Sequence, residues 1–455
     1  MATTAAVILA AGQGTRLKSK IPKVLHLIAG RPMIDYVIAT ARELKLIATV
    51  VVVGHGADQV RRALGDRVAY AVQSPQLGTG HAVLQTQSVL EGKSDAVLVL
   101  YGDMPLLSTE VLRNLVRMYE QQDATIAMLT CIRQEAMGFG RVVRGEEDRV
   151  LEIVEESQAS PRQLEIRELN LGVYCFSSSW LWSNLPRLTA SPKGEYYLTD
   201  LVALASDQGR RVEAIVVEDP VQVLGINDRV HLAAAERAVR TRIAESLMRG
   251  GVTIVDPHTT YVDAEVVVGA DTVIRPNTHL YGQTHIGTDC IIGPNTMVRD
   301  SAIGDDCHVQ FSVVEEAVLE DHVSVGPFAH LRKGAHLAEG VHMGNFGEVK
   351  NSSLGAGSKM GHFSYLGDAQ VGKDVNIGAG TVTCNFDGHA KHQTVIEDGA
   401  FIGSDTMLRA PVRVGKRART GAGSVVTHDV PDDVTVIGAP ARPTKKTKDT
   451  KAIGE

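Results

Sequence analysis

A six-residue repeat runs through the C-terminal part of the chain, from about Gly250 to Gly438. An aliphatic residue is followed by a small one, usually glycine, and then by four variable positions, as in Leu354-Gly355, Met360-Gly361 and Leu366-Gly367. A short fixed period of this kind predicts a β-solenoid in which each coil has three short strands and three turns. The aliphatic residue points into the prism, and glycine stands where the backbone turns sharply.

The residues before the repeat predict a different domain. From residue 1 to about 226, short β-branched runs alternate with amphipathic segments, which predicts an α/β domain with a mostly parallel, Rossmann-like sheet. We expect its ligands at the carboxyl ends of the strands. Residues 227–249 have no glycine or proline and predict a connecting helix. The predicted solenoid then occupies 250–440, and a charged tail, 441–455, is expected to be disordered.

Composition excludes several classes of protein. A length of 455 residues favours two domains over one, and a net charge of −7 argues against a protein that coats nucleic acid. Five scattered cysteines without C-x-x-C spacing indicate reduced thiols. The first residues, MATTAAVILAAGQGTR, resemble neither a secretion signal nor a membrane span. We therefore expect a soluble, cytoplasmic protein that binds neither nucleic acid nor membrane.

A glycine-rich turn follows the first predicted strand, in the sequence Leu9-Ala10-Ala11-Gly12-Gln13-Gly14-Thr15-Arg16. Its backbone N–H groups can approach an anion, and Arg16 and Lys23 add positive charge for a triphosphate. Taken alone, the turn could simply join a strand to a helix. With Pro22-Lys23, however, it resembles the signature of sugar-nucleotidyltransferases, which are nucleoside-triphosphate sugar-1-phosphate pyrophosphorylases.

The resemblance implies roles for further residues of this domain. Arg16 and Lys23 would be catalytic, Gln73 would contact uracil, and Asp103 and Asn227 would bind Mg²⁺. By themselves, Asp103 could be a turn residue and Asn227 could cap the connecting helix. The nucleotide and sugar site implied by the resemblance comprises Leu9, Ala10, Ala11, Gly12, Gly14, Lys23, Gln73, Gly78, Thr79, Tyr101, Asp103, Gly140, Glu155, Asn170 and Asn227.

Two features of the repeat argue that the solenoid has a chemical role. Residues 383–392 exceed the hexad spacing and must leave the coil as a loop, and such loops are usually functional. Arg332 and Lys350 lie 18 residues apart, so they stack on one face. We expect His362 and Tyr365 to join them from an adjacent face, in a groove between neighbouring solenoids. Two cations and a histidine suit a phosphorylated substrate whose amine must lose a proton.

From residue 5 to about 440, the chain resembles the bifunctional N-acetylglucosamine-1-phosphate uridyltransferase / glucosamine-1-phosphate acetyltransferase family, whose solenoid is a left-handed parallel β-helix. The resemblance implies a homotrimer that acetylates glucosamine-1-phosphate with acetyl-CoA. It then transfers uridylyl from UTP to N-acetylglucosamine-1-phosphate, and the product serves cell-wall and lipopolysaccharide synthesis.

The same resemblance assigns roles within the solenoid. His362 would be the acetyl-transfer base, and Cys384 a bystander. The implied sugar-phosphate site comprises Arg332, Lys350, Tyr365, Asn376, Asn385 and Lys391, and the implied acetyl-CoA site Ala379, Asn385, Ser404, Ala422 and Arg442. One position departs from the family pattern, because Ala439 stands where an arginine for the CoA phosphates is often found. Arg442 or Lys445-Lys446 could replace that arginine.

Two alternatives remain open at this point. The first is a pyrophosphorylase with a single activity and a structural solenoid, for which Arg332, Lys350 and His362 would have no purpose. The second is a zinc site of the carbonic-anhydrase kind, built from the histidines at 330, 336, 342 and 362. His330, His336 and His342 recur every six residues, so we expect them on three different faces of a coil, where they cannot share one ion within a chain.

Overall fold

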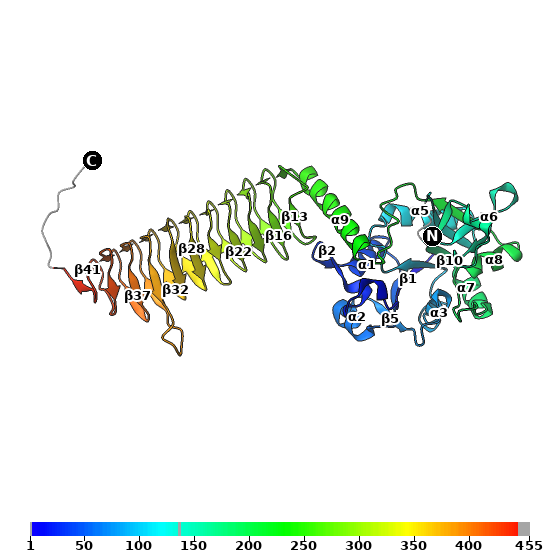
Figure 1. The fold of residues 1–455 in the computed structure, drawn as a ribbon, viewed down its shortest axis with the longest axis horizontal. Helices are drawn as coiled ribbons and strands as arrows, with labels where there is room; N and C mark the ends of the chain where they lie inside the picture. The colour runs from blue at the N-terminus through cyan, green and yellow to red at the C-terminus, as the bar shows by residue number, and fades with distance from the viewer. Residues whose placement is uncertain (1, 135–137, 445–455) are drawn as a thin grey trace. The chain divides into compact units, whose positions relative to one another are not determined.

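The apolar runs of the first domain form a twisted sheet whose strands are mostly parallel. The computed structural model describes residues 2–134 and 138–444, which form two units that divide between Val239 and Arg240 (Figure 1). In the first unit the sheet order is β11-β7-β10-β6-β1-β4-β5, and only β10 runs antiparallel to its neighbours along this path. Their bounds are β1 Thr4–Ala10, β4 Ala48–Val53, β5 Ala69–Val72, β6 Ala96–Tyr101, β7 Ile126–Ile132, β10 Glu168–Ser177 and β11 Val212–Val216.

Helices complete this α/β unit. An amphipathic stripe places Leu112 and Leu115 of α5 (Thr109–Gln121) in the interior, and Ser108 caps the helix by accepting a hydrogen bond from the N–H of Val111 at 3.3 Å. Other helices are α1 Met33–Glu43, α3 Thr79–Leu84, α7 Ser178–Asn184, α8 Asp200–Asp207 and α9 Arg229–Arg249. Helix α9 contains most of the predicted connecting segment. No helix in the described ranges is long and apolar enough to cross a membrane.

The hexad repeat folds into a three-sided parallel solenoid, consistent with the predicted left-handed β-helix (Figure 1). Every third strand joins the same sheet. We name the sheets face 1, which begins at β12 (Thr253–Ile254), face 2, which begins at β13 (Tyr261–Val262), and face 3, which begins at β14 (Val267–Val268). On face 1 the register pairs Ser324 with His342, His342 with Lys359 and Asn376 with Phe401. The coils are therefore not of constant length, because those pairs are 18, 17 and 25 residues apart.

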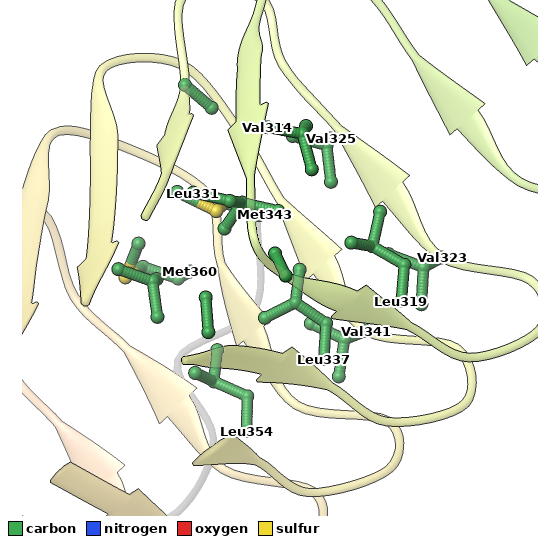
Figure 2. Close-up of a cluster of buried hydrophobic side chains, with 14 of the residues drawn as sticks. Val314, Leu319, Val323, Val325, Leu331, Leu337, Val341, Met343, Leu354 and Met360 are labelled. Carbon is green, nitrogen blue, oxygen red and sulfur yellow. The ribbon is translucent and has the colours of Figure 1, made fainter. Parts of the chain in front are cut away.

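The interior of the solenoid is a set of stacked aliphatic columns. Leu319, Leu337 and Leu354 follow one another in register on face 3, and all are at most 2% exposed (Figure 2). Burial of apolar surface stabilises a fold by roughly 25 cal/mol per Å². Because each column buries this surface between successive coils, every coil is stabilised by the coils on either side. Glycine lies where coils touch at an edge, since a Cβ on Gly344 would overlap the backbone of Gly361.

The last coil is closed by a short antiparallel strand. Arg442 and Pro443, which the sequence places in the charged tail, form β42 (Arg442–Pro443) and pair with Ile437 and Val436 of β41 (Thr435–Ile437). This pairing covers the final edge of face 1, which would otherwise expose unpaired backbone groups. Residues 445–455, including Lys445 and Lys446, lie outside the described residues.

Candidate active sites

A cavity opens at the carboxyl ends of β1 and β6 in the first unit. Its volume is about 570 Å³, within the range of small-molecule sites. Leu9 and Ala10 come from the end of β1, and Tyr101 and Asp103 from the end of β6 and the turn that follows. The wall comprises Leu9, Ala10, Ala11, Gly12, Gln13, Lys23, Val24, Gln73, Gln76, Gly78, Thr79, Ala82, Tyr101, Asp103, Glu195 and Tyr197.

The glycine-rich turn lies along this cavity with its backbone accessible. Nothing lies within 4 Å of the position that a Cβ on Gly12 would take, so a ligand can approach the main chain there. Gly14 has φ +63°, and a Cβ at this residue would come within 2.8 Å of the Lys23 side chain. Gly14 thus packs against Lys23, whereas Gly12 leaves the main chain open to the cavity.

A small polar network joins the four residues expected to handle charge. The Lys23 ammonium forms an ion pair with Asp103 and donates to Asn227 Oδ1 at 3.1 Å. Arg16 donates to the same oxygen at 2.9 Å, and the N–H of Ile226 donates to the carbonyl of Asp103 at 3.0 Å. Asn227 does not cap α9, because Asp228 accepts the hydrogen bond from the N–H of His231, at 2.9 Å. The side chain of Asn227 is therefore directed to the charged network.

This network fits a magnesium ion. Asp103 and Asn227 offer one carboxylate and one amide oxygen near enough to be bridged by the single ammonium group of Lys23. Mg²⁺ prefers oxygen ligands and commonly takes only one or two from the protein, with water and substrate phosphates supplying the others. No cluster of three or more His, Cys, Asp or Glu side chains suited to a metal occurs among residues 2–134 and 138–444.

Gln73 and the loop after it form another wall of the cavity. Gln73 is buried and donates to the carbonyl of Gly78 at 2.8 Å, and Gln76 donates to the carbonyl of Ala11 at 2.5 Å. Gly78 has φ +91°. The hydroxyl of Thr79 accepts a hydrogen bond from the N–H of Leu198 at 3.0 Å. These contacts fix the loop before any ligand is present.

The residues expected to hold the sugar lie beside Tyr101, although they do not line the cavity wall. Burial raises the pKa of the Tyr101 hydroxyl, and the nearby Asp103 and Glu155 carboxylates raise it further. Burial also raises the pKa of Glu155, which accepts from the Thr199 hydroxyl at 3.1 Å. Asn170 Oδ1 accepts from the Tyr174 hydroxyl at 2.9 Å and from the N–H of Gly172 at 3.0 Å.

Two glycines of the implied sugar site, Gly140 and Gly172, lie where packing leaves no room for a side chain. A Cβ on Gly140 would come within 2.8 Å of the Ile153 side chain, and a Cβ on Gly172 within 2.6 Å of the Tyr101 ring. Asn170 pairs with Thr130 at the point where the register of β10 shifts against β7. At this bulge, residues 170–174 lose their regular pairing with β7, and they lie beside Tyr101.

Glu195 and Tyr197 line the cavity but were not predicted from the sequence. They belong to a loop whose Tyr196 accepts from the N–H of Gly80 at 2.9 Å and donates to the carbonyl of Leu77 at 2.8 Å. These long-range backbone bonds bring residues 195–197 next to the segment from Leu77 to Gly80. The only local signal is a turn at Ser191–Gly194, where the N–H of Gly194 donates to the carbonyl of Ser191.

The solenoid carries its own candidate site along the edge where face 1 passes into face 2. Five residues of successive coils form what we call the His362 column: Asn345, His362, Ala379, Ser404 and Ala422. Backbone bonds connect the coils at this edge, from Gly380 to Phe363 at 2.6 Å, from Asp405 to Ala379 at 2.6 Å and from Gly423 to Ser404 at 2.8 Å. His362 is exposed, with Nδ1 3.4 Å from Asn345 Oδ1.

Three cations gather at the opposite edge of face 2, and we call them the basic cluster: Arg332, Lys350 and Lys391. Arg332 lies one coil above Lys350, and its N–H donates to the carbonyl of Val349 at 2.9 Å. Lys391 first, and then Arg332, lower the pKa of Lys350 by repulsion between like charges. Glu348, which pairs with Arg332 at 2.8 Å, offsets only part of this positive charge. The cluster is suited to an anion.

Tyr365 lies between the column and the cluster. It belongs to β31 (Ser364–Gly367) and pairs with Glu348 of β28 (Gly347–Lys350), on face 2. The expectation that Tyr365 approaches Lys350 from an adjacent face is therefore wrong. His362 stands at the corner, and the chain has turned onto face 2 by Ser364. Asn376, on β33 (Asn376–Ile377), does lie on another face, face 1.

The loop that interrupts the repeat holds Lys391 in place. Phe386 pairs with Lys391 in an isolated antiparallel bridge, and Asp387 accepts from His392 at 2.7 Å. Asp387 also accepts from the N–H groups of His389 and Ala390, both at 2.8 Å. At its base, Asn385 donates to Asp368 at 2.6 Å. The loop is a hydrogen-bonded hairpin that positions one lysine of the cluster.

Cys384 lies at the start of this loop, and burial raises the pKa of its thiol. A raised pKa leaves less of the reactive thiolate at neutral pH. The geometry therefore offers no activation of this thiol.

The histidines considered for a zinc site point in different directions. His330 lies on face 2, His336 on face 3 and His342 on face 1, each on its own strand. Each has a separate polar neighbour: Glu315 at 3.1 Å, Glu320 at 2.8 Å and Ser324 at 2.7 Å, respectively. Within one chain they cannot share an ion.

Comparison with known proteins agrees with both halves of this description. A family model described as MobA-like NTP transferase domain matches residues 6–198, and one described as bacterial transferase hexapeptide (six repeats) matches residues 265–300 and 393–428. The chain is thus a nucleotidyltransferase joined to a hexapeptide-repeat transferase.

Curated relatives match over nearly the whole length. Proteins named "Bifunctional protein GlmU" are 48% identical in Pelobacter propionicus, covering 95% of both chains, and 47% identical in an Exiguobacterium species, covering 98% of this chain and 99% of the relative. The relative in Brevibacillus brevis is 45% identical and covers 95% of this chain and 94% of its own. The chain belongs to the bifunctional GlmU family.

The packing of Gly78 leads to a prediction that needs no ligand. In Gly78→Ala, the new Cβ would lie 2.7 Å from the carbonyl oxygen of Tyr196, at a residue with φ +91°. Gly92→Ala is a matched control, because Gly92 has φ +72° with nothing within 4 Å of the added atom. We expect Gly92→Ala to lower the free energy of unfolding by about 1–2 kcal/mol, and Gly78→Ala by more. Equal losses in denaturant titrations would contradict the packing described here.

Proposed function

We propose that the chain makes UDP-N-acetylglucosamine in two steps at two separate sites. The solenoid transfers acetyl from acetyl-CoA to glucosamine-1-phosphate, and the α/β unit then transfers uridylyl from UTP to the resulting N-acetylglucosamine-1-phosphate. The observation that carries this proposal is the pairing of the His362 column with the basic cluster across face 2. A solenoid with a purely structural role has no use for that pairing. The product is a precursor for the cell wall and for lipopolysaccharide.

Acetyl transfer follows from the geometry of face 2. Arg332, Lys350 and Lys391 bind the sugar phosphate, while Tyr365 and Asn385 hold the sugar between the cluster and His362. His362 removes a proton from the attacking ammonium, since histidine is the side chain that most often acts as general base in enzymes. The amine then attacks the thioester of acetyl-CoA, which lies along Ala379, Ser404 and Ala422. The C–N bond forms, the C–S bond breaks, and CoA leaves as the thiol.

Uridylyl transfer follows from the charged network of the first site. The uracil binds at Gln73 and the Gly78–Thr79 loop, and the triphosphate along Gly12 and Gly14. Arg16 and Lys23 offset the negative charge, and such an oriented cation is typically worth roughly 10²–10³ in rate. A phosphate oxygen of the sugar phosphate, held near Glu155 and Asn170, attacks the α-phosphorus, and pyrophosphate leaves. Asp103 and Asn227 would hold Mg²⁺, which neutralises phosphate charge when bound.

Two features of the solenoid support a homotrimer. Asn376 projects from face 1, whereas Tyr365 projects from face 2, so a substrate that contacts both must lie between two chains. Beside the His362 column, the rings of Phe328 and Phe346 stack with centroids 5.3 Å apart, and Phe311 contacts Phe328 in a tilted arrangement at 5.7 Å. Phe328 and Phe346 are 55% and 60% exposed, an apolar stripe that suits contact with another copy.

We place the enzyme in the cytoplasm. The five cysteines are free, as expected in a reducing compartment, and UTP and acetyl-CoA are cytoplasmic metabolites.

The two activities should fail separately. His362→Ala should lower acetyl transfer by about 10²–10⁴-fold through loss of the base, while uridylyl transfer to supplied N-acetylglucosamine-1-phosphate stays normal. Removal of Mg²⁺ with EDTA should have the opposite pattern. Both reactions are followed by mass spectrometry of the products. If His362→Ala acetylates at the wild-type rate, the proposed acetyl site is wrong.

Lys350 should act on the sugar phosphate. Loss of a charged hydrogen bond of about 1.5–3 kcal/mol predicts that Lys350→Ala lowers kcat/KM for glucosamine-1-phosphate roughly ten- to a hundredfold. Lys333→Ala is the control, because Lys333 lies at the same edge but is 79% exposed and pairs with Glu316. Steady-state kinetics with varied sugar phosphate distinguish the two. Equal effects of both variants would argue against the basic cluster as the phosphate site.

The oligomeric proposal is tested by mass in solution. Light scattering should give about three times the chain mass of 48.8 kDa. Phe346→Asp, which places a charge in the exposed phenylalanine stripe, should shift the protein toward monomer and reduce acetyl transfer. A monomeric wild type with full acetyl transfer would show that one chain completes the site.

A further inference from the structure

An exposed arginine stands near the C-terminal end of the His362 column. Arg419 begins β39 (Arg419–Thr420) on face 1, and it is exposed between the buried Ala418 and Thr420. Its side chain therefore points outward. Among the described residues, the structure records no hydrogen bond or ion pair for its guanidinium group.

Three basic residues close to Arg419 in sequence differ from it in this respect. Arg417 forms a bidentate pair with Asp433, with both distances 2.7 Å, and Arg413 pairs with Glu397 at 3.1 Å. Lys416 lies 3.9 Å from Asp398. Among the described residues, Arg419 thus has no carboxylate partner, whereas each of these three pairs with a carboxylate.

The position of Arg419 relative to the column is fixed by register. Arg419 pairs with Phe401 of β36 (Phe401–Ile402) on the preceding coil and with Thr435 on the following one. Ser404 follows Phe401 by three residues, and Ala422 follows Arg419 by three. From His362 to Ala422 the column descends three coils, about 14 Å at ~4.8 Å per coil. Arg419 therefore flanks the column at its far end from His362.

If the solenoid transfers acetyl groups, the length of the His362 column determines how far the rest of acetyl-CoA extends from the reacting thioester. The inference therefore rests on the proposed function. The thioester must lie at His362, where the amine is deprotonated. The pantetheine arm then carries the phosphates of CoA away from that point, along Ala379, Ser404 and Ala422. The phosphates need a cation at the end of this path.

We propose that Arg419 binds the phosphates of the 3′-phospho-ADP part of CoA. A guanidinium group can donate two parallel hydrogen bonds to a phosphate, and Arg419 has no ion pair with any described residue to break first. Phe401, 46% exposed and adjacent on face 1, offers an apolar surface for the adenine ring. Arg442, whose Nη1 donates to the carbonyl of Ala441 at 2.9 Å, lies on β42 at the end of the same face.

The test compares two acetyl donors that differ only in the phosphorylated part. Arg419→Ala should raise the KM for acetyl-CoA about tenfold, the equivalent of one charged hydrogen bond, and leave the KM for S-acetylpantetheine unchanged. Arg419→Lys should recover part of the loss for acetyl-CoA. Arg417→Ala is the matched control, since it removes a nearby arginine that is paired, and it should change neither KM.

Each other outcome overturns the assignment. An unchanged KM for acetyl-CoA in Arg419→Ala, or an equal loss with both donors, shows that Arg419 does not contact the phosphates. An equal effect of Arg417→Ala shows a nonspecific loss of positive charge. If the wild type transfers acetyl from neither donor, the acetyltransferase function fails and this inference fails with it. Since Arg419 is exposed and pairs with no residue that the structure describes, its variants should retain the wild-type melting temperature, which circular dichroism checks.

Discussion

The hydrogen-bonded stacking of each coil on the next determines the chemistry of the solenoid. Residues distant in sequence become neighbours because a strand repeats at the same place one coil later. His362, Ala379, Ser404 and Ala422 form a line along one edge for this reason, and Arg332 and Lys350 another line across face 2. The width of one sheet therefore separates His362 from the basic cluster, and the aliphatic columns packed inside maintain that separation.

An ion pair and hydrogen bonds from two cationic side chains hold the first site together. Lys23 binds both Asp103 and Asn227, and Arg16 binds Asn227 as well, so two cations and two oxygen ligands are assembled before substrate arrives. A preassembled network of this kind costs little reorganisation when a phosphate enters. The two halves of the chain thus both gather cations at their candidate sites, on unrelated scaffolds.

The sequence predicted most of the architecture because its signals are local. The hexad determines a coil, and β-branched runs determine the parallel strands; both fold predictions are confirmed. The face of Tyr365 was predicted wrongly, because a hexad that contains a corner residue such as His362 continues onto the next face. Glu195 and Tyr197 could not be predicted, since backbone bonds between residues far apart bring them to the cavity. The roles of individual site residues stay predictions.

The loop that interrupts the repeat leaves the solenoid after β34 (Val382–Cys384), two residues later than the predicted start at 383, and the chain returns at β35 (Thr394–Ile396). The coils on both sides keep their register. The length of the loop is therefore uncoupled from the solenoid interior. A longer or shorter hairpin would move Lys391 relative to Lys350 without shifting His362 or Ser404 along their edge. Under the proposed function, the size of the acceptor that fits the site would then change independently of the donor path.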